Sequence, residues 1–399
     1  MSDTPWLTIM GLGEDGPDGL PPASRKALDQ AHIVMGAARH LSLLPDMTAQ
    51  IIQWPVPFAD GIPLLLAHRG TPTVVLASGD PFWHGAGATL AQHLSASEYR
   101  TLPAPSAMSH AAAALGWPLD QTLTMGLHAA PFARLRPHLH NAQRALVTLR
   151  DGAAAISLAR WLSEIGFGTS TLHVMEALGG PRQRIRATTA RDFAFGDIRH
   201  PVCLGLDIRG EGPLIPLASG RPDDLFDHDG QLTKRPVRAL TLSALAPKPG
   251  EHLWDIGGGS GSISIEWLWA HPTTRASAVE TNPTRADRIR SNAAALGADR
   301  LTVITGTAPD ALNNLPPPDA VFIGGGLDTD LLAHVWAALP HGARLVANAV
   351  TLEAESLLAT WHAEKGGDML RIELARSHPL GRKRGWKSAY PIVQWSTVK

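Results

Sequence analysis

An aspartate followed by glycines at alternate positions is the pattern in this sequence with the clearest chemical meaning. Asp255 opens the pattern, and its glycines are Gly257, Gly259 and Gly261. It follows a short apolar run and precedes apolar residues at helical spacing, so we expect a strand, a turn and a helix in that order. A glycine turn at a helix N-terminus presents free backbone N–H groups and a positive dipole end to a bound ligand. The dinucleotide fingerprint does not fit, because Ser262 stands where its third glycine is needed.

A second acid strengthens the functional interpretation of this turn. Glu280 ends the next predicted strand, 276–279, where its carboxylate can accept hydrogen bonds from both hydroxyls of a ribose. The alternative is a turn that only joins a buried strand to a helix. Acid and glycines together resemble the first motif of the class I S-adenosylmethionine-dependent methyltransferases, and this resemblance implies S-adenosylmethionine as the cofactor.

The elements that must position these residues form a regular series. Predicted strands at 301–304, 319–323 and 343–348 each run into a loop, and the closing runs 369–375 and 390–395 read as an antiparallel pair. Five parallel strands and such a pair predict a seven-stranded, Rossmann-like sheet. The loop after the fourth strand is Gly324-Gly325-Gly326, and glycines allow backbone to approach a large planar ligand closely.

The first half also alternates strands with helices, which is the α/β pattern. A buried strand at 6–10 runs into glycines at 11–16, but prolines and glycines delay the next helix to about Ser24, so this loop is not a dinucleotide site. The strand 73–77 ends in Ser78-Gly79-Asp80-Pro81. Such a turn at the carboxyl edge of a sheet indicates a site, the alternative being an Asp80 side chain that caps the following helix.

These segments, with 103–116 and 176–179, resemble a tetrapyrrole methylase domain over roughly residues 5–205. The resemblance implies two α/β subdomains with S-adenosylmethionine bound in the cleft between them. It places the cofactor at Gly79, Asp80 and Ser106.

Composition limits the remaining possibilities. The chain has 399 residues, 44% of them hydrophobic, which favours two globular domains. The net charge of -1 argues against nucleic acid or a membrane as partner. One cysteine, Cys203, and the absence of zinc-spaced ligands favour a reducing compartment without a metal site, and the first 20 residues lack the features of a secretory signal. We therefore expect a cytoplasmic protein.

Domain boundaries follow from composition and the motifs. The segment 207–231 is rich in glycine, proline and aspartate without a sustained period, so we predict a linker there. The first domain is then 1–206 and the second is 232–399.

The second domain resembles the decarboxylating precorrin methyltransferase domain of cobalamin synthesis. The resemblance rests on the segments 233–238, 255–261, 306–309, 324–326 and 348–353. It implies Thr307 and Ala308 at the cofactor, and Arg238, Gly324, Gly325 and Asn348 at the substrate. We expect Lys234 to lie closest to the chemistry, the alternative for the basic run 234–238 being a solvated helix start.

The two resemblances in this order imply a fused methyltransferase. Such an enzyme methylates a polycarboxylate tetrapyrrole at the bridging carbons C5 and C15 and decarboxylates the acetate side chain on ring C. By analogy with separate proteins, the first domain methylates C5 and the second acts at C15, and relatives of the second domain imply a homo-oligomer. The planar guanidinium group of arginine can donate two parallel hydrogen bonds to one carboxylate, which suits the carboxylates of this substrate. The candidate cations are Arg182, Arg184, Arg186, Lys234, Arg238, Arg382, Lys383, Arg384 and Lys387.

Two alternatives from other classes stay open at this point. One is a module that binds S-adenosylmethionine without turnover. The other is a methyltransferase that acts on RNA, against which the neutral charge and the lack of basic, aromatic-rich stripes count.

Overall fold

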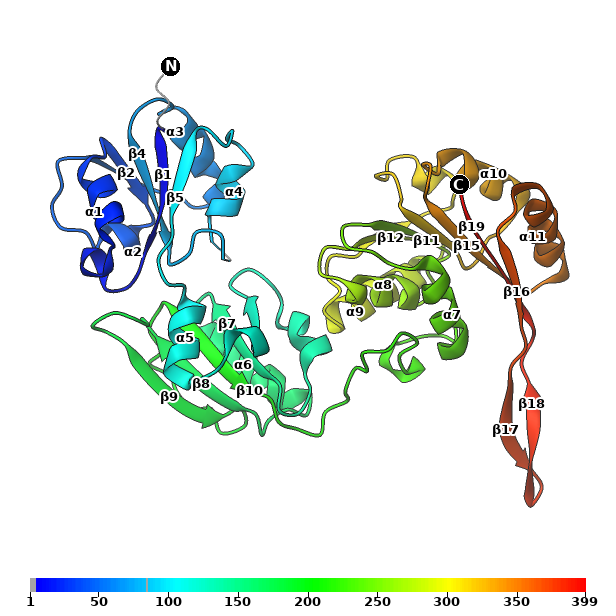
Figure 1. The fold of residues 1–399 in the computed structure, drawn as a ribbon. Coiled ribbons are helices and arrows are strands. Elements are labelled where there is room, and N and C mark those ends of the chain that lie inside the picture. The colour runs from blue at the N-terminus through cyan, green and yellow to red at the C-terminus, as the bar shows by residue number, and fades with distance from the viewer. Residues whose placement is uncertain (1–4, 84) are drawn as a thin grey trace. The chain divides into compact units, whose positions relative to one another are not determined.

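The computed structural model describes residues 5–83 and 85–399, which form two compact units. The first unit runs to Ala130 and resumes at Leu139–Pro213, and the second comprises Pro131–His138 and Leu214–Lys399. Each unit is built on its own sheets (Figure 1).

The first sheet of the first unit has five parallel strands in the order β3-β2-β4-β1-β5. Its central strands β1 and β4 are buried along nearly their whole length, as their continuous apolar runs predict. The strands are β1 Leu7–Leu12, β2 Ile33–Gly36, β3 Gln50–Gln53, β4 Thr73–Ser78 and β5 Tyr99–Leu102. The helices are α1 Pro22–Asp29, α2 Ala38–Leu41, α3 Gly61–Leu66 and α4 Gly87–Ala91.

The second sheet of the first unit is mixed, in the order β6-β7-β10-β8-β9. Helix α5 (Ala107–Leu115) connects the two sheets and begins at Ser106, whose hydroxyl accepts the backbone N–H of Ser109. The strands are β6 Leu123–Gly126, β7 Arg144–Leu149, β8 Thr171–Glu176, β9 Arg184–Thr189 and β10 Val202–Asp207, with α6 Gly152–Glu164. The expected pair of α/β subdomains is therefore confirmed.

The second unit contains the expected seven-stranded sheet, in the order β13-β12-β11-β14-β15-β19-β16. Five strands are parallel, and β19 and β16 are antiparallel additions at one edge. Separate apolar clusters cover its two faces. The strands are β11 His252–Ile256, β12 Arg275–Glu280, β13 Thr302–Thr305, β14 Ala320–Ile323, β15 Arg344–Ala349, β16 Asp368–Ile372 and β19 Ile392–Val398. The helices are α7 Arg235–Leu245, α8 Ser262–Ala270, α9 Pro283–Ala295, α10 Thr329–Ala338 and α11 Leu352–Lys365.

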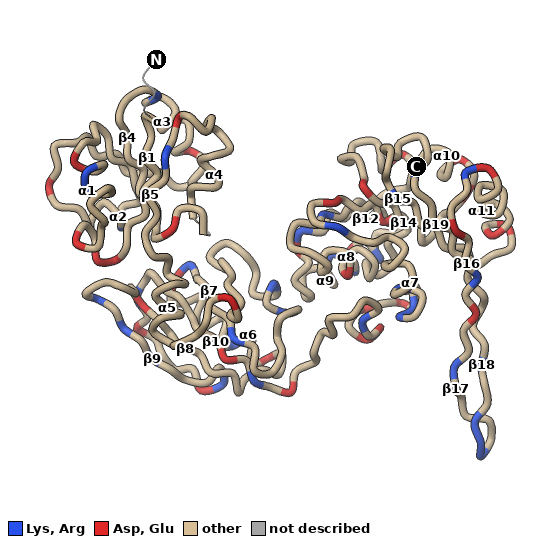
Figure 2. The backbone as a smooth tube through the Cα atoms, in the orientation of Figure 1, with Lys and Arg blue, Asp and Glu red and all other residues tan. Residues whose placement is uncertain are grey.

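A two-stranded hairpin interrupts the closing pair of that sheet. Its strands, β17 (Ala375–Leu380) and β18 (Lys383–Ser388), pair with each other and extend away from the sheet of the second unit (Figure 1). Figure 2 shows Lys and Arg along this hairpin. By sequence, the hairpin contains the predicted substrate cations Arg382, Lys383, Arg384 and Lys387. All four are exposed.

Residues 214–231, which composition places in the linker, are packed onto the second unit. Ile215 and Phe226 are buried in the apolar cluster around α8, with 2% and 3% of their surface exposed. The sequence of this segment has no sustained apolar periodicity because individual side chains and one short 3₁₀ turn, Asp223–Leu225, hold the segment in place. Within residues 5–83 and 85–399 no helix is long and apolar enough to cross a membrane.

Candidate functional site

The alternate glycines of the second unit lie at the carboxyl end of β11, as the motif predicts. Gly257, Gly259 and Gly261 have φ angles of +74°, +59° and +77°, which side chains with a Cβ rarely adopt. A Cβ on Gly257 would lie 2.8 Å from the backbone nitrogen of Gly325. The two predicted glycine loops are therefore in direct contact, and Gly324 extends that contact by donating its N–H to the Ile256 carbonyl at 2.9 Å.

Glu280 is held at the same edge by backbone donors. One carboxylate oxygen accepts the Gly259 N–H and the other accepts the Asn282 N–H, both at 2.9 Å. Asn282 in turn caps α9. The Glu280 side chain is thus buried and fixed beside the glycine turn.

Asp255 is buried below the turn and faces the helix that follows. Its carboxylate accepts the Ser264 hydroxyl at 2.6 Å and the Ser264 N–H at 3.2 Å. Burial raises the pKa of Asp255 to about 6, the hydrogen bonds from Ser264 oppose this, and the Glu280 charge adds to it. Asp255 therefore holds the first turn of α8 in place.

The loop after β13 joins the same edge. Gly306 donates its N–H to the Glu280 carbonyl at 3.0 Å, which brings the following Thr307 and Ala308 next to the Glu280 backbone. The predicted cofactor residues of the second domain are thereby gathered around one end of the sheet.

Arg238 does not have the environment expected of a substrate-binding residue. Its side chain has no exposed surface, and its Nε donates to Glu266 at 2.7 Å. Further donors go to Asp223 and to the carbonyls of Thr233 and Arg221. The guanidinium is committed to protein partners, so a substrate-binding role for Arg238 is wrong on geometric grounds.

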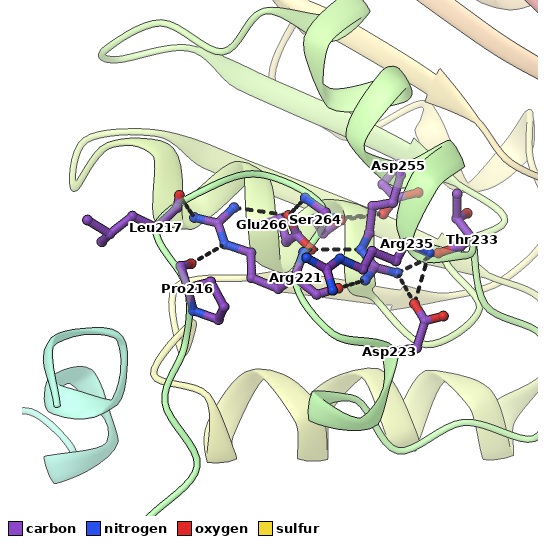
Figure 3. A network of polar contacts seen from close by, with 11 residues as sticks. Pro216, Leu217, Arg221, Asp223, Thr233, Arg235, Asp255, Ser264 and Glu266 are labelled. Atoms are coloured by element: carbon purple, nitrogen blue, oxygen red, sulfur yellow. Dashed lines mark hydrogen bonds and ion pairs between the residues drawn. The ribbon is translucent and has the colours of Figure 1, made fainter. Parts of the chain in front are cut away.

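The network around Glu266 holds the segment before α7 in place (Figure 3). Arg221 donates to Glu266 at 2.9 Å and to the carbonyls of Pro216 and Leu217. Lys234, the residue before α7, is exposed and lies beside this network in sequence. The exposure of Lys234 fits either interpretation of the basic run, a solvated helix start or a residue at the chemistry, whereas the buried Arg238 is not part of a solvated start.

Asn348 is engaged within the second unit. Its amide nitrogen donates to the Thr241 hydroxyl at 3.0 Å, and its oxygen accepts from Gln394 at 2.9 Å. This triad joins α7, β15 and β19 and leaves Asn348 less available to a substrate than its motif implies.

The first unit contains a cavity of about 570 Å³ lined by both of its sheets. Gly79 and Ser106 line it, as predicted, and the φ of Gly79 is +54°. Asp80 instead accepts the Phe82 N–H at 2.9 Å, so its carboxylate stabilises the turn. Asp80 does not cap the following helix, α4, because the N-cap of α4 is Ala86 and has no side-chain hydrogen bond.

Sequence reasoning missed a polar cluster on the wall of this cavity. Glu14, Arg39, His40 and Ser78 line it together. Ser78 ends β4 and Glu14 lies two residues after β1, whereas Arg39 and His40 lie in α2; a position near a strand end was thus a signal for Ser78 and Glu14 taken singly.

The other predicted arginines of the first unit are paired. Arg184 donates to both oxygens of Glu176 and to Asp197, and Arg186 pairs with the same two acids. Arg182 pairs with Glu14 at 2.8 Å. Arg184 and Arg186 therefore stabilise the edge strand β9 rather than offering free forks to a ligand. Among the described residues no group of three or more His, Cys, Asp or Glu is placed to hold a metal ion.

Comparisons with known proteins agree with this division into two parts. Residues 7–194 match the family described as Tetrapyrrole (Corrin/Porphyrin) Methylases, and residues 224–399 match the Precorrin methyltransferase domain. The chain is 49% identical over 401 residues to the precorrin-6Y C(5,15)-methyltransferase (decarboxylating) of Sinorhizobium sp., covering 99% of this chain and 97% of that protein.

Two further similarities concern the second part. The cobalt-precorrin-6B C(15)-methyltransferase (decarboxylating) of Salmonella typhimurium is 31% identical over 177 residues, which are 43% of this chain and 91% of that protein. The crystal structure of the C-terminal domain of precorrin-6Y C5,15-methyltransferase from Rhodobacter capsulatus is 51% identical. The match covers 46% of this chain and 100% of the chain from Rhodobacter capsulatus, with a TM-score of 0.45.

Proposed function

The chain belongs to the precorrin-6Y C5,15-methyltransferase (decarboxylating) family, and we propose on that premise how its two units share the work. The reaction is methylation of a precorrin at C5 and C15 with loss of carbon dioxide, in cobalamin biosynthesis. The first domain, 1–206, methylates C5. The second domain, 232–399, methylates C15 and decarboxylates the ring C acetate, which the Salmonella relative of that part supports by its name.

The observation that carries this proposal is the Glu280 carboxylate beside the Gly259 turn. A buried acid that is fixed by backbone donors keeps accepting capacity for ribose hydroxyls, and the left-handed glycines leave room for a ligand against the backbone. These residues fit S-adenosylmethionine. In the second domain we assign it to Asp255, Gly257, Gly259, Gly261, Glu280, Thr307 and Ala308. In the first domain we assign it to Gly79 and Ser106, with Asp80 shaping the turn.

The chemistry requires positioning more than a nucleophilic side chain. S-adenosylmethionine supplies an electrophilic methyl group, and an electron-rich carbon of the macrocycle attacks it in line. The chain contributes alignment and exclusion of water. Gly324 and Gly325 support this at the second site, because their backbone contacts the cofactor turn and they carry no side chain that would keep a planar ring away from the backbone.

We assign Lys234 to the decarboxylation step. Its exposed side chain begins α7, and the Glu266 network fixes the backbone on either side of it. A cation there can stabilise charge that develops on the ring as carbon dioxide leaves. Unchanged methylation and carbon dioxide release in Lys234→Ala would show this assignment to be wrong, with Arg235→Ala as the neighbouring exposed control.

Calorimetric titration of S-adenosylhomocysteine into the whole chain and into Asp255→Ala tests the cofactor sites. Two sites that fall to one in the variant are expected, because Asp255 belongs to the second domain alone. Complete loss of binding in the variant would remove the first domain from cofactor binding and with it the C5 assignment. Two sites without any methyl transfer to a precorrin would favour a non-catalytic binding module.

The assembly and location of the protein are part of the same proposal. We infer a homo-oligomer from the resemblance of the second domain to proteins that assemble, and a cytoplasmic location from the single, buried Cys203. Analytical ultracentrifugation at several concentrations tests the first of these inferences.

A further inference from the structure

Three neighbouring strands of the first sheet bring a charged cluster to the wall of the cavity in the first unit. Glu14 lies two residues after β1, Arg39 lies in α2, the short helix after β2, and Ser78 ends β4; these strands lie in the order β2-β4-β1. Because the strands are parallel, their carboxyl ends meet at one edge. The cofactor residues assigned above, Gly79 and Ser106, line the same cavity but do not use this cluster.

The cluster carries an excess of positive charge. Glu14 is 7% exposed and forms ion pairs with both Arg39 and Arg182, so one carboxylate faces two guanidinium groups. Burial lowers the pKa of Arg39, a cost of desolvation that the Glu14 charge offsets in part. An additional anion at Arg39 would therefore be stabilised, whereas an additional cation would not.

His40 adds a buried donor that has no partner in the described protein. Arg39 donates from Nη2 to His40 Nε2 at 2.7 Å, and a guanidinium can only donate. The neutral imidazole then carries its proton on Nδ1, and this atom is buried without a hydrogen-bond partner. Burial lowers the pKa of His40 to about 3, so the ring stays neutral at ordinary pH. Because Nδ1 has no accessible surface and lies on the side of the ring away from Nε2, His40 acts on the cluster through Nε2, where it accepts a hydrogen bond from the Arg39 guanidinium.

An apolar rim lies next to the charged cluster. Trp54, Val56 and Phe58 line the same cavity, and Val56 is 95% exposed and Phe58 38% exposed. Trp54 and Phe58 stack with ring centroids 4.9 Å apart. A flat apolar surface beside a cationic group matches a planar macrocycle that bears carboxylates at its edge.

We propose that Arg39 binds a carboxylate side chain of the tetrapyrrole in the first unit, through the guanidinium hydrogens that are not donated to Glu14, His40 and Ser78. Glu14 is a positioning residue that holds the Arg39 guanidinium toward the cavity. The macrocycle lies on Val56 and Phe58, the exposed part of the rim, and the buried Trp54 supports Phe58 by stacking. This inference rests on the proposed function of the first unit and names the residues that select its substrate.

The test compares Arg39→Ala, Arg39→Lys and Glu14→Gln in the full chain. Arg39→Ala is expected to raise the KM for C5 methylation roughly tenfold to a hundredfold, as for a lost charge-assisted hydrogen bond, with a smaller change in kcat. Arg39→Lys keeps the charge but not the fork, so it recovers part of the loss. Glu14→Gln gives a smaller rise in KM because Arg39 stays charged but is less well held. Arg160→Ala, an exposed arginine on α6, is the matched control and leaves KM unchanged.

Binding measured without turnover separates this inference from the proposed function. Uroporphyrin, a planar polycarboxylate, is titrated into each variant by absorbance, with its methyl ester as the uncharged probe. Arg39→Ala weakens binding of the acid but not of the ester, and the affinity for S-adenosylhomocysteine does not change. An unaltered KM and unaltered uroporphyrin binding in Arg39→Ala would overturn the carboxylate contact while leaving C5 methylation in place. Equal losses of cofactor and porphyrin affinity that Arg39→Lys does not relieve would overturn it too, because they make Arg39 a structural residue. A wild-type chain that never methylates C5 would instead refute the proposed function itself.

Discussion

Arg238 and Glu266 form an ion pair in which both side chains have no exposed surface, with 2.7 Å between Nε and Oε1. Glu266 also accepts the backbone N–H groups of Gly220 and Arg221 and the Arg221 side chain. This carboxylate, in the middle of α8, therefore holds Gly220 and Arg221, in the segment that precedes α7, against the second unit. The pairing explains why a basic run next to a cofactor turn contains one cation that cannot serve the substrate.

Removal of the Glu266 charge should destabilise the second unit strongly. Glu266→Gln leaves Arg221 and Arg238 buried without their shared counter-ion, and a buried pair broken in this way costs about 3–5 kcal/mol. Urea unfolding of the full chain, followed by tryptophan fluorescence, measures the loss. Asp287→Asn breaks an exposed i,i+3 pair with Arg290 and should change the free energy of unfolding by no more than about 0.5 kcal/mol. Similar midpoints for the two variants would contradict the anchoring role.

The pH dependence of stability should reveal the environment of Asp255. Its pKa is raised to about 6 in the folded chain from 3.8, so between about pH 4 and pH 6 the unfolded state has released a proton that the native state keeps. The contribution of Asp255 to the free energy of unfolding therefore falls as pH rises through that window, by about 3 kcal/mol in total. Asp255→Asn does not titrate. The free energy of unfolding of the wild type minus that of Asp255→Asn should decrease from pH 4 to pH 7. Plots of the two free energies against pH that run parallel would be inconsistent with a raised pKa.

Burial explains why the sequence indicated some strands and why it missed several strands at the sheet edges. β1 and β11 are buried along their length and appear in the sequence as continuous apolar runs. Three of the missed strands, β3, β5 and β9, lie at the edge of a sheet and are partly or largely exposed, whereas β10, which was also missed, is buried between β7 and β8. Edge strands carry polar residues such as Gln50 and Gln53, so their apolar period is too weak to detect.

In the candidate site, some residues are placed by the local requirements of the backbone and others by contacts with residues distant in sequence. The glycines at 257, 259 and 261 were predictable because a left-handed backbone is a requirement of the turn itself. The burial of Arg238 was not, because it depends on Glu266, 28 residues further on. The cluster of Glu14 and Arg39 was equally hidden, since only the strand order brings these residues together.

Glu280 should control cofactor affinity in the second unit alone. Glu280→Ala removes the acceptor for the ribose and also frees the Gly259 N–H, so the Kd for S-adenosylhomocysteine at that site should rise roughly tenfold to a hundredfold. The site of the first unit should keep its affinity. Asp330→Asn, which changes an exposed acid at the start of α10, is the control. Calorimetry that shows two intact sites in Glu280→Ala would exclude Glu280 as the ribose ligand.

Gly11 should be as important to the cofactor site of the first unit as Gly79 is. A Cβ on Gly11 would lie 1.8 Å from the Gly79 carbonyl oxygen and 2.6 Å from the Ala104 nitrogen, and those two atoms belong to a 3.2 Å hydrogen bond that joins the cofactor turn to the chain leading into Ser106. Gly11→Ala must push this pair apart, since neither neighbour is a flexible side chain.

The expected result of Gly11→Ala is a loss of about 1–3 kcal/mol in the stability of the first unit, as for overpacking in a core. We also expect weaker S-adenosylhomocysteine binding there, with the second site unaffected. Gly196→Ala adds the same methyl group where nothing lies within 4 Å and should change neither quantity. Because Gly11 lies outside the predicted set of cofactor residues, intact binding in Gly11→Ala would show that the Gly79 turn does not depend on the end of β1 for its position.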